Sequence, residues 1–320
     1  SPQWKFLRLA FVINDFGGIE QLKLVDLKKP EPKEGEVLVH IKATSVNPVD
    51  YKIREGKFKG RTPHNFPVIL GWDVAGIIED RGHGTRRYEV GEEVWAYIRR
   101  PEIGEGSYAE YVCLPESYLS NKPANLSFEE SATIPLVGLT AYQSLFDAGK
   151  LHSGQTVLIT GASGGVGSMA VQLAKNIGAK VIGVASRKNK DYVKNILGAD
   201  DFIDYTSNNF ADSVAEKVDL VFDTVGGNTL ETAPKILKDQ GRVVSIAGKL
   251  DKEKVKNTFN TTFVYVFVEP QSKQLDKIRD LVEKGMLKPH LQNTFKLEDI
   301  KKAHELIETG HTTGKIAITI

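Results

Sequence analysis

The 320-residue sequence has a single cysteine, Cys113, and no apolar run long enough to cross a membrane as a helix. One cysteine excludes an intramolecular disulfide framework and any zinc site built on several thiolates. The seven histidines show neither H-E-x-x-H nor H-x-x-x-H spacing, so no helical face carries a histidine pair. We therefore expect no metal ion. The scarcity of cysteine favours a reducing compartment, such as the cytoplasm.

Neither sign of charge is in excess. Lys and Arg total 42 and Asp and Glu total 41, which gives a formal net charge of +1. Non-specific binding to nucleic acid or to an acidic membrane needs a concentrated basic surplus, so we expect neither nucleic acid nor membrane insertion. The chain does not open on a signal-peptide pattern, but without an initiator Met it stays open whether a targeting segment preceded Ser1.

Two patterns of apolar residues divide the sequence, and together they predict an α/β fold. From residue 1 to about 125, apolar and polar residues alternate, as in EVLVHIKATSV (36–46) and SYAEYVCL (107–114), which predicts a mainly β domain. From about 126, apolar runs alternate with helical segments, which predicts a parallel sheet covered on both faces. The predicted strands are TVLIT (156–160), KVIGVAS (180–186), DFIDY (201–205), DLVFDTVGG (219–227) and GRVVSIAG (241–248).

The pattern of apolar residues changes again over the last sixty residues. TFVYVFVEP (262–270) predicts a strand, and LDKIRDLVEKG (275–285) and IKKAHELIETG (300–310) predict amphipathic helices that end at glycine. KIAITI (315–320) predicts a terminal strand that returns to the β domain. The chain is long enough for two domains.

One segment predicts a dinucleotide site. Residues 151–186 read as a βαβ unit whose turn is Ala162-Ser163-Gly164-Gly165-Val166-Gly167. Its glycines let the backbone approach a pyrophosphate at the N-terminus of a helix that begins near Val166, and Gly167 allows that helix to pack closely on the strand. A strand on either side of the motif favours dinucleotide binding over a merely structural turn.

The end of the second strand indicates which cofactor binds. NAD-specific sites carry an Asp or Glu about 20 residues past the turn, whereas this chain has Ser186, Arg187 and Lys190 there. Two charge-assisted bonds to a 2′-phosphate, at about 1.5 to 3 kcal/mol each, would favour NADPH by roughly a hundredfold or more. The alternative is a solvated helix start that happens to be basic.

Six segments, in order along nearly the whole chain, resemble the zinc-free quinone oxidoreductase branch of the medium-chain dehydrogenase/reductase superfamily. They are VNPVDYKIREG (46–56), ILGWDVAG (69–76), GSYAEYVCLP (106–115), IPLVGLTAYQSL (134–145), TGASGGVG (160–167) and TGKIAI (313–318). The resemblance implies a GroES-like domain (1–125), a Rossmann NADP-binding domain (126–268) and a C-terminal return to the first domain (269–320), with the cofactor cleft between the domains. It also implies NADPH-dependent reduction of quinones, or of the conjugated double bond of enones and alkenals.

The same resemblance argues against zinc. Zinc-dependent members carry a catalytic Cys and a Gly-His-Glu turn, and the matching places here hold Val46 or Asn47 and Gly71-Trp72-Asp73. Neither Val nor Trp ligates zinc. Without a Lewis acid, hydride delivery to a conjugated carbon becomes easier than alcohol oxidation. We expect Trp72 to form a wall of an apolar pocket over the nicotinamide.

Three residues are the catalytic candidates. Related quinone reductases carry a Tyr near the substrate five residues beyond the Asn of the first motif, where this chain has Lys52, preceded by Tyr51. The Lys52 ammonium could polarise the carbonyl and stabilise an enolate, with Tyr51 or water supplying the proton. Asn47 matches a position that lines the nicotinamide pocket. The alternative for Lys52 is a snorkelling surface residue.

The resemblance assigns further cofactor contacts, each of which could instead be structural. They are Val137 and Thr140 in the nicotinamide pocket, Tyr205 on the adenine side, Ala247 and Gly248 where the chain passes the cofactor, Phe267 and Val268 across the nicotinamide from the substrate, and Lys315 near the pyrophosphate.

Two other functions and one assembly stay open at the level of sequence. An enoyl-thioester reductase is less favoured, because that branch has a catalytic Tyr where this chain has Phe58. An NADPH-binding adaptor or sensor with little turnover is the alternative from another class, since fold alone does not set function. The apolar strand TFVYVFV is a candidate edge for a homodimer.

Overall fold

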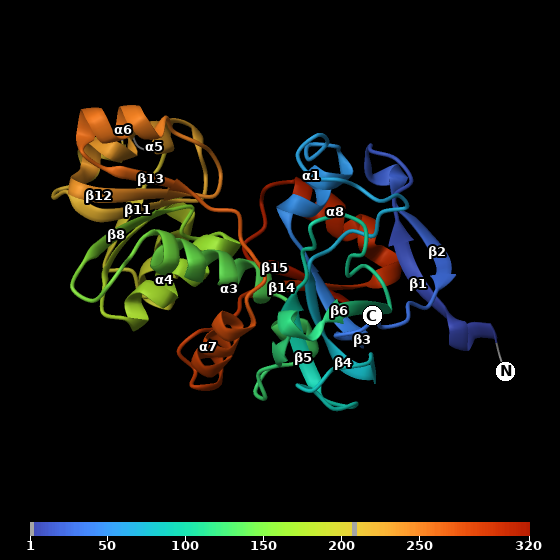
Figure 1. Ribbon diagram of the computed structural model, residues 1–320. Coiled ribbons are helices and arrows are strands. Elements are labelled where there is room, and N and C mark those ends of the chain that lie inside the picture. Colours follow the sequence, from blue (N-terminus) through green and yellow to red (C-terminus); the bar gives the residue numbers. More distant parts are fainter. Residues whose placement is uncertain (1–2, 207–209) are drawn as a thin grey trace. The chain divides into compact units, whose positions relative to one another are not determined.

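The computed structural model describes residues 3–206 and 210–320, which form two compact units (Figure 1). Unit 1 comprises Ser1–Leu136 with Glu269–Ile320, and unit 2 comprises Val137–Val268. The C-terminal segment therefore belongs to the same unit as the N-terminal one. Within the described residues, no helix has both the length and the apolar character needed to cross a membrane.

Unit 1 is built around a mainly antiparallel sheet, in the order β14-β15-β3-β4-β5-β7, with β6 also paired to β3 and with β14 and β15 paired in parallel. β1 and β2 form a separate antiparallel pair. The strands are β1 (Leu7–Val12), β2 (Lys23–Lys28), β3 (Glu36–Val46), β4 (Asp73–Arg81), β5 (Glu93–Tyr97), β6 (Tyr111–Pro115), β7 (Ser120–Asn121), β14 (Leu291–Lys296) and β15 (Lys315–Thr319). The helices are α1 (Pro48–Arg54), α2 (Phe128–Ser131), α7 (Ser272–Glu283) and α8 (Ile300–Glu308).

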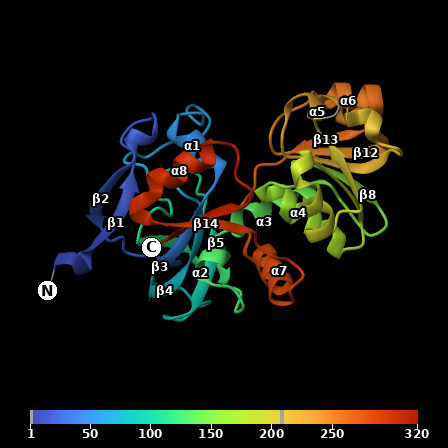
Figure 2. The same cartoon turned by 180° about the vertical axis from the view of Figure 1, so that it is seen from behind.

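The terminal strand returns to this sheet as the sequence predicts. β15 pairs antiparallel with the second half of β3, with Ile316 opposite Val46, and the first half of the same edge of β3 pairs with β6. The other edge of β3 pairs with β4. β3 is thus the central strand of unit 1, and α1 follows directly from its end (Figure 2).

Unit 2 is a six-stranded parallel sheet in the order β10-β9-β8-β11-β12-β13. Its elements are β8 (Thr156–Thr160), α4 (Gly165–Asn176), β9 (Lys180–Ala185), β10 (Asp201–Asp204), β11 (Val218–Asp223), α5 (Gly227–Thr232), β12 (Leu237–Ser245), α6 (Lys252–Phe259) and β13 (Thr262–Tyr265), while α3 (Pro135–Tyr142) spans its beginning. In chain order this is 3-2-1-4-5-6, the doubly wound order of Rossmann domains.

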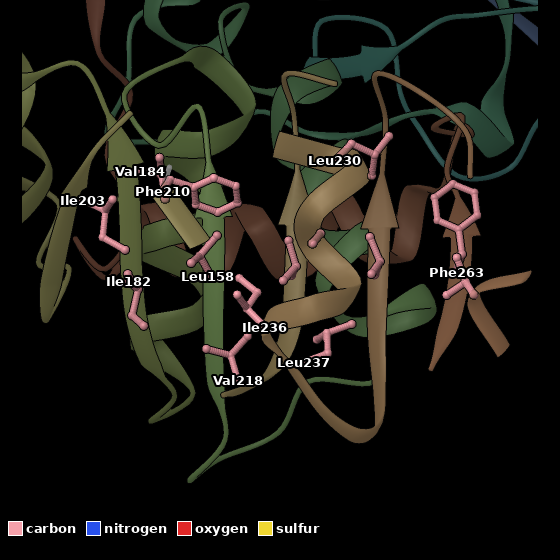
Figure 3. Close-up of a cluster of buried hydrophobic side chains, with 14 residues drawn as sticks. Leu158, Ile182, Val184, Ile203, Phe210, Val218, Leu230, Ile236, Leu237 and Phe263 are labelled. Carbon is pink, nitrogen blue, oxygen red and sulfur yellow. The ribbon is translucent and has the colours of Figure 1, made fainter. Parts of the chain in front are cut away.

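Helices cover both faces of this sheet, with α4 on one side and α5 and α6 on the other (Figure 1). The face under α5 and α6 carries a hydrophobic cluster to which all six strands contribute, including Leu158, Ile182 and Phe263 (Figure 3). Leu230 of α5 and Val255 of α6 belong to the same cluster. Near-continuous apolar strands are expected where both faces of a parallel sheet are buried.

Two predicted strands are shorter than expected. TFVYVFVEP was predicted as a strand over 262–270, but β13 ends at Tyr265 because its partner β12 ends at Ser245, opposite that residue. SYAEYVCL was predicted as a strand over 107–114, but β6 begins only at Tyr111. The N–H groups of Ser107 and Tyr108 bond the carbonyls of Gly71 and Leu70 instead of a strand ladder.

Candidate functional site

The glycine-rich turn after β8 is shaped by close contact. Gly161 adopts φ +62°, and α4 begins at Gly165, next to the predicted start near Val166. A Cβ on Gly167 would lie 2.0 Å from the Gly161 carbonyl oxygen, so only glycine fits there. The helix therefore packs against the turn as closely as the motif predicts.

The N-terminus of α4 is suited to an anion. Gly164 is its N-cap and makes no side-chain capping bond. The first N–H groups of a helix have no intrahelical acceptor, and the helix dipole adds positive potential there. Backbone donors at this end can therefore hold a pyrophosphate, which fits the dinucleotide predicted from the sequence.

The ends of β8, β9 and β10 bring several predicted contacts together. Asn189 Nδ2 donates to Ser163 Oγ at 3.2 Å and to Ser186 Oγ at 3.1 Å, which joins the glycine-rich turn to the end of β9. Asn189 was not among the predicted site residues, although it lies within the basic segment that was. The Tyr205 N–H bonds the Ala185 carbonyl at 3.2 Å, and the Tyr205 side chain is exposed.

Arg187 and Lys190 are exposed at this edge, where a phosphate could reach them. The nearby Asp204 carboxylate was not anticipated. It accepts hydrogen bonds from the N–H and hydroxyl of Thr206, and these, helped by the charge of Arg187, lower the pKa of Asp204. The Asp204 carboxylate therefore stays ionised, and its negative charge lies near Arg187 at this edge.

A buried carboxylate that sequence analysis missed ties the strand ends of unit 2 together. Asp223, at the end of β11, is fully buried and accepts from the Thr160 hydroxyl at 2.8 Å and the Ser245 hydroxyl at 2.7 Å. It also accepts from the N–H groups of Val225 and Gly226. The carboxyl ends of parallel strands are where such domains bind ligands, so Asp223 lies beneath the predicted cofactor edge.

The remaining predicted contacts of unit 2 lie around the same sheet. The N–H groups of Ala247 and Gly248 donate to Ser245 Oγ at 3.1 and 3.2 Å, which ties their loop to Asp223 through one hydroxyl. The other predicted side chains in unit 2 are buried or partly buried, which is also what a structural role would give. They are Val137 and Thr140 in α3, both 4% exposed, and Phe267 and Val268 just after β13.

In unit 1 the structure brings Asn47 and Lys315 together. Asn47 is 1% exposed at the N-cap of α1, and its side-chain oxygen accepts a hydrogen bond from Lys315 Nζ. Its Nδ2 donates to Asp73 Oδ2 at 2.8 Å. The amide therefore bridges the first residue of β15 and the first residue of β4.

Asp73 and Lys315 form the charged part of this cluster. The Asp73 carboxylate is fully buried and also accepts from the Ser45 hydroxyl and the Leu136 N–H. Burial raises the pKa of Asp73, and the positive charge of Lys315 opposes that rise. Burial lowers the pKa of Lys315, and the charges of Asp73 and Asp50 oppose it. Each charge thus stabilises the other in a poorly hydrated place.

Lys52 and Tyr51 lie on α1 outside this cluster. Lys52 is exposed, and Tyr51 is partly buried. Burial and the negative charges of Glu55 and Glu308 raise the pKa of Tyr51, so its phenol keeps its proton at neutral pH. The structure therefore joins Asn47 to Lys315, and it leaves Lys52 directed to solvent.

The turn that matches the zinc-binding turn of zinc-dependent dehydrogenases is occupied by a buried aromatic side chain. Trp72 is 6% exposed and packs edge-on against Tyr97, with ring centroids 6.0 Å apart. Gly71 has φ +95°, and a Cβ there would meet the Ser107 hydroxyl at 2.3 Å. Among the described residues, no group of three or more His, Cys, Asp or Glu side chains could hold a metal ion. The absence of zinc stays a prediction.

Two family models match most of this architecture. Residues 33–124 match the alcohol dehydrogenase GroES-like domain, and residues 197–318 match a model described as zinc-binding dehydrogenase. The chain is 37% identical over 317 residues to the 2-methylene-furan-3-one reductase of Solanum lycopersicum, covering 97% of this chain and 78% of that protein. This chain belongs to the medium-chain dehydrogenase/reductase superfamily.

Other relatives place the chain in the quinone oxidoreductase branch of the superfamily. It is 35% identical over 318 residues to the chloroplastic NADPH-dependent alkenal/one oxidoreductase of Arabidopsis thaliana, covering 97% of this chain and 78% of that protein. The solved structure of the quinone oxidoreductase from Coxiella burnetii superposes with a TM-score of 0.89 at 32% identity, covering 98% of this chain and 99% of that one.

Proposed function

We propose that this superfamily member is a zinc-independent, NADPH-dependent reductase of the conjugated C=C bond of enones and alkenals, and of quinones. The observation that carries the proposal is the cofactor edge of unit 2. There the uncapped N-terminus of α4 faces the end of β9, which carries Ser186 and Arg187 where an NAD site would have a carboxylate. The similarity to relatives named for alkenal, furanone and quinone reduction supports the substrate class.

The residues present fit NADPH. Ser163 and Gly164 to Gly167 would hold the pyrophosphate through the turn and the first N–H groups of α4, with Lys315 as a further cation. Ser186, Arg187 and Lys190 would bind the 2′-phosphate, and Tyr205 would cover the adenine. Thr140, Ala247, Gly248, Phe267 and Val268 would line the nicotinamide half. The bound cofactor supplies the hydride.

The protein's part is to stabilise the negative charge that develops on the substrate and to supply a proton to it. When hydride reaches the β-carbon of an enone, charge builds on the carbonyl oxygen, where the ammonium of Lys52 would stabilise it. The Tyr51 phenol, which keeps its proton at neutral pH because burial and Glu55 raise its pKa, would protonate the α-carbon directly or through water. Asn47 would fix the geometry between them as the N-cap of α1.

Steady-state NADPH consumption with a small enone, a naphthoquinone and an alkenal tests this function. We expect turnover with at least one of the three, and a lower rate when NADH replaces NADPH. NADPH binding without consumption across the panel would instead establish the adaptor or sensor alternative. Turnover of an enoyl thioester, assayed as a fourth substrate, without turnover of the other three would favour an enoyl-thioester reductase, although Phe58 stands where that branch has its Tyr.

Three further expectations belong to this proposal. The domain division of 1–125, 126–268 and 269–320 is close to the two compact units, whose boundaries lie after Leu136 and Val268. A homodimer would pair through β13, which is the edge strand of its sheet. We place the protein in the cytoplasm, and imaging of the tagged full-length chain would test that, since similar proteins include chloroplastic and mitochondrial ones.

A further inference from the structure

Four side chains of unit 1 form a continuous buried hydrogen-bonded chain that the proposed mechanism does not use. Arg54 Nη1 lies 2.5 Å from His304 Nδ1, His304 Nε2 lies 3.0 Å from the Tyr108 hydroxyl, and that hydroxyl donates to Asp50 Oδ2 at 2.7 Å. Each of the four residues is at most 2% exposed. We call this set the buried chain.

The hydrogen bonds of the buried chain all run in one direction from donor to acceptor. An arginine only donates hydrogen bonds, so His304 Nδ1 must accept and Nε2 must carry the ring hydrogen. Burial, together with the charge of Arg54, lowers the pKa of His304 to about 3, which keeps the ring neutral. His304 therefore donates to Tyr108, and Tyr108 donates to Asp50. Every donor in the series points toward the Asp50 carboxylate.

Arg54 lies at the end of the buried chain that is opposite Asp50, and it is held there by several hydrogen bonds. Its guanidinium binds both carboxylate oxygens of Glu308, at 2.8 and 3.3 Å, and its Nε donates to the Gly17 carbonyl at 3.2 Å. These bonds fix α1 to α8, because Arg54 ends the first helix and Glu308 ends the second. Tyr108, just before β6, is hydrogen-bonded to both helices, through Asp50 of α1 and His304 of α8.

Asp50 is the near end, and it holds the first turn of α1. Its Oδ2 accepts a second hydrogen bond, from the Asn47 N–H at 2.9 Å. Within the described part of the chain, its Oδ1 is buried without a hydrogen-bond partner. The Asn47 side chain is occupied by Asp73 and Lys315, so this backbone bond orients the turn that carries the amide. Asp50 thus links the buried chain to Asn47, one of the three residues assigned to the reaction.

We propose that Asp50 is a positioning residue for the reductase reaction: its ionised carboxylate, oriented by Tyr108, holds the Asn47 turn in the geometry that catalysis requires. The inference rests on the proposed reductase function. The charged and titratable groups around Asp50 are Tyr108, Asp73 and Lys315, with His304, Arg54 and Glu308 further along the buried chain. Protonation of Asp50 removes the charge that attracts both donors, so the turn loosens.

Burial raises the pKa of Asp50 to about 7, against two hydrogen bonds that oppose the rise. Ionisation therefore falls within the range where activity is measured, and we expect kcat to rise with pH through about 7. Asp50→Asn should lower kcat at high pH more than it changes KM and should abolish that inflection. Tyr108→Phe should move the inflection upward by roughly one pH unit or more, because the ionised form loses a hydrogen bond.

The test is the pH profile of kcat for enone reduction by the wild type, Asp50→Asn, Tyr108→Phe and the exposed control Asp26→Asn. A merely structural role would scale kcat equally at every pH and leave the inflection in place. An unmoved inflection in Tyr108→Phe overturns the inference, and it does so even if Asp50→Asn fails to fold. A wild type without turnover overturns the proposed function instead, which separates the two failures.

Discussion

The carboxylate of Asp223 accepts a 2.7 Å hydrogen bond from the hydroxyl of Ser245, across the ends of β11 and β12. The same carboxylate binds the Thr160 hydroxyl at the end of β8. The Ser245 hydroxyl in turn accepts from the N–H groups of Ala247 and Gly248. One buried side chain therefore ties together the strand ends that the cofactor is proposed to cross.

Replacing Asp223 by Ala should weaken both stability and NADPH binding. The change leaves two hydroxyls and two N–H groups buried without their acceptor, which should cost roughly 2 to 4 kcal/mol of the free energy of unfolding. Thermal unfolding followed by circular dichroism, and titration with NADPH, would measure the two effects. The control is Asp219→Ala at the other end of β11, whose carboxylate accepts from the Thr156 N–H. That variant should lose stability and keep its NADPH affinity, and equal NADPH affinity in both variants would contradict the assignment.

Cofactor choice should depend on the cations after β9. The double substitution Arg187→Ala with Lys190→Ala should raise the KM for NADPH at least tenfold, because two charge-assisted bonds to the 2′-phosphate are lost. The KM for NADH should hardly change. Lys188→Ala, an exposed lysine of the same segment, is the control. An equal rise for both cofactors would show that the segment does not read the phosphate.

The roles of Lys52 and Tyr51 can be separated by single substitutions. Lys52→Met keeps the length of the side chain and removes the charge, and it should lower kcat for an enone about a hundredfold if the ammonium stabilises the enolate. Tyr51→Phe should lower kcat about tenfold, since water can replace the phenol as proton donor. Lys57→Met, an exposed lysine shortly after α1, is the control. Unchanged rates in both variants would leave the reaction to cofactor positioning.

Asp50 and His304 should have opposite effects on the pH dependence of stability. The pKa of Asp50 is raised by burial from 3.8 to about 7, so the folded state holds a proton that the unfolded state loses, and stability falls as pH rises through that window. The pKa of His304 is lowered by burial from 6.5 to about 3, so the unfolded state takes up a proton as pH falls, and stability rises with pH. Between about pH 4 and pH 6.5 the two slopes, each up to about 1.4 kcal/mol per pH unit, oppose each other.

Urea unfolding across that window should reveal the balance. Asp50→Asn should make the free energy of unfolding rise more steeply with pH than in the wild type, and His304→Gln should make it rise less steeply or fall. All three tryptophans of the chain belong to unit 1, so their fluorescence reports the unit that contains both residues. Slope changes of the same sign in the two variants would contradict the assigned pKa shifts.

Much of the fold follows from local pattern. The alternating run 36–46 forms β3 with the predicted bounds, and the apolar runs of unit 2 form a parallel sheet, because period and length identify strands of these kinds. The predicted strands 262–270 and 107–114 were too long for a reason that no local pattern contains. A strand lasts only as long as its partner, and β12 ends at Ser245.

The site was predictable where its residues are close in sequence. The glycine-rich turn and the basic end of β9 follow within one βαβ unit, so motif spacing suffices to find them. Asp50 and His304, by contrast, lie on helices far apart in the sequence and are joined through Tyr108. Arg54 and Glu308 of the same two helices are 254 residues apart. Charged residues of this kind are usually exposed, and only the fold shows that these are buried and paired.

The most direct test of the account is the fate of the hydride. Reaction of an enone with NADPH that carries deuterium at both positions of nicotinamide C4 should give a saturated ketone with one deuterium on the former β-carbon. Deuterium on the carbonyl carbon of an allylic alcohol would instead show carbonyl reduction, the reaction expected of a zinc-type site. That result, or a product without deuterium, would contradict the assignment of this protein as a zinc-independent reductase of conjugated double bonds.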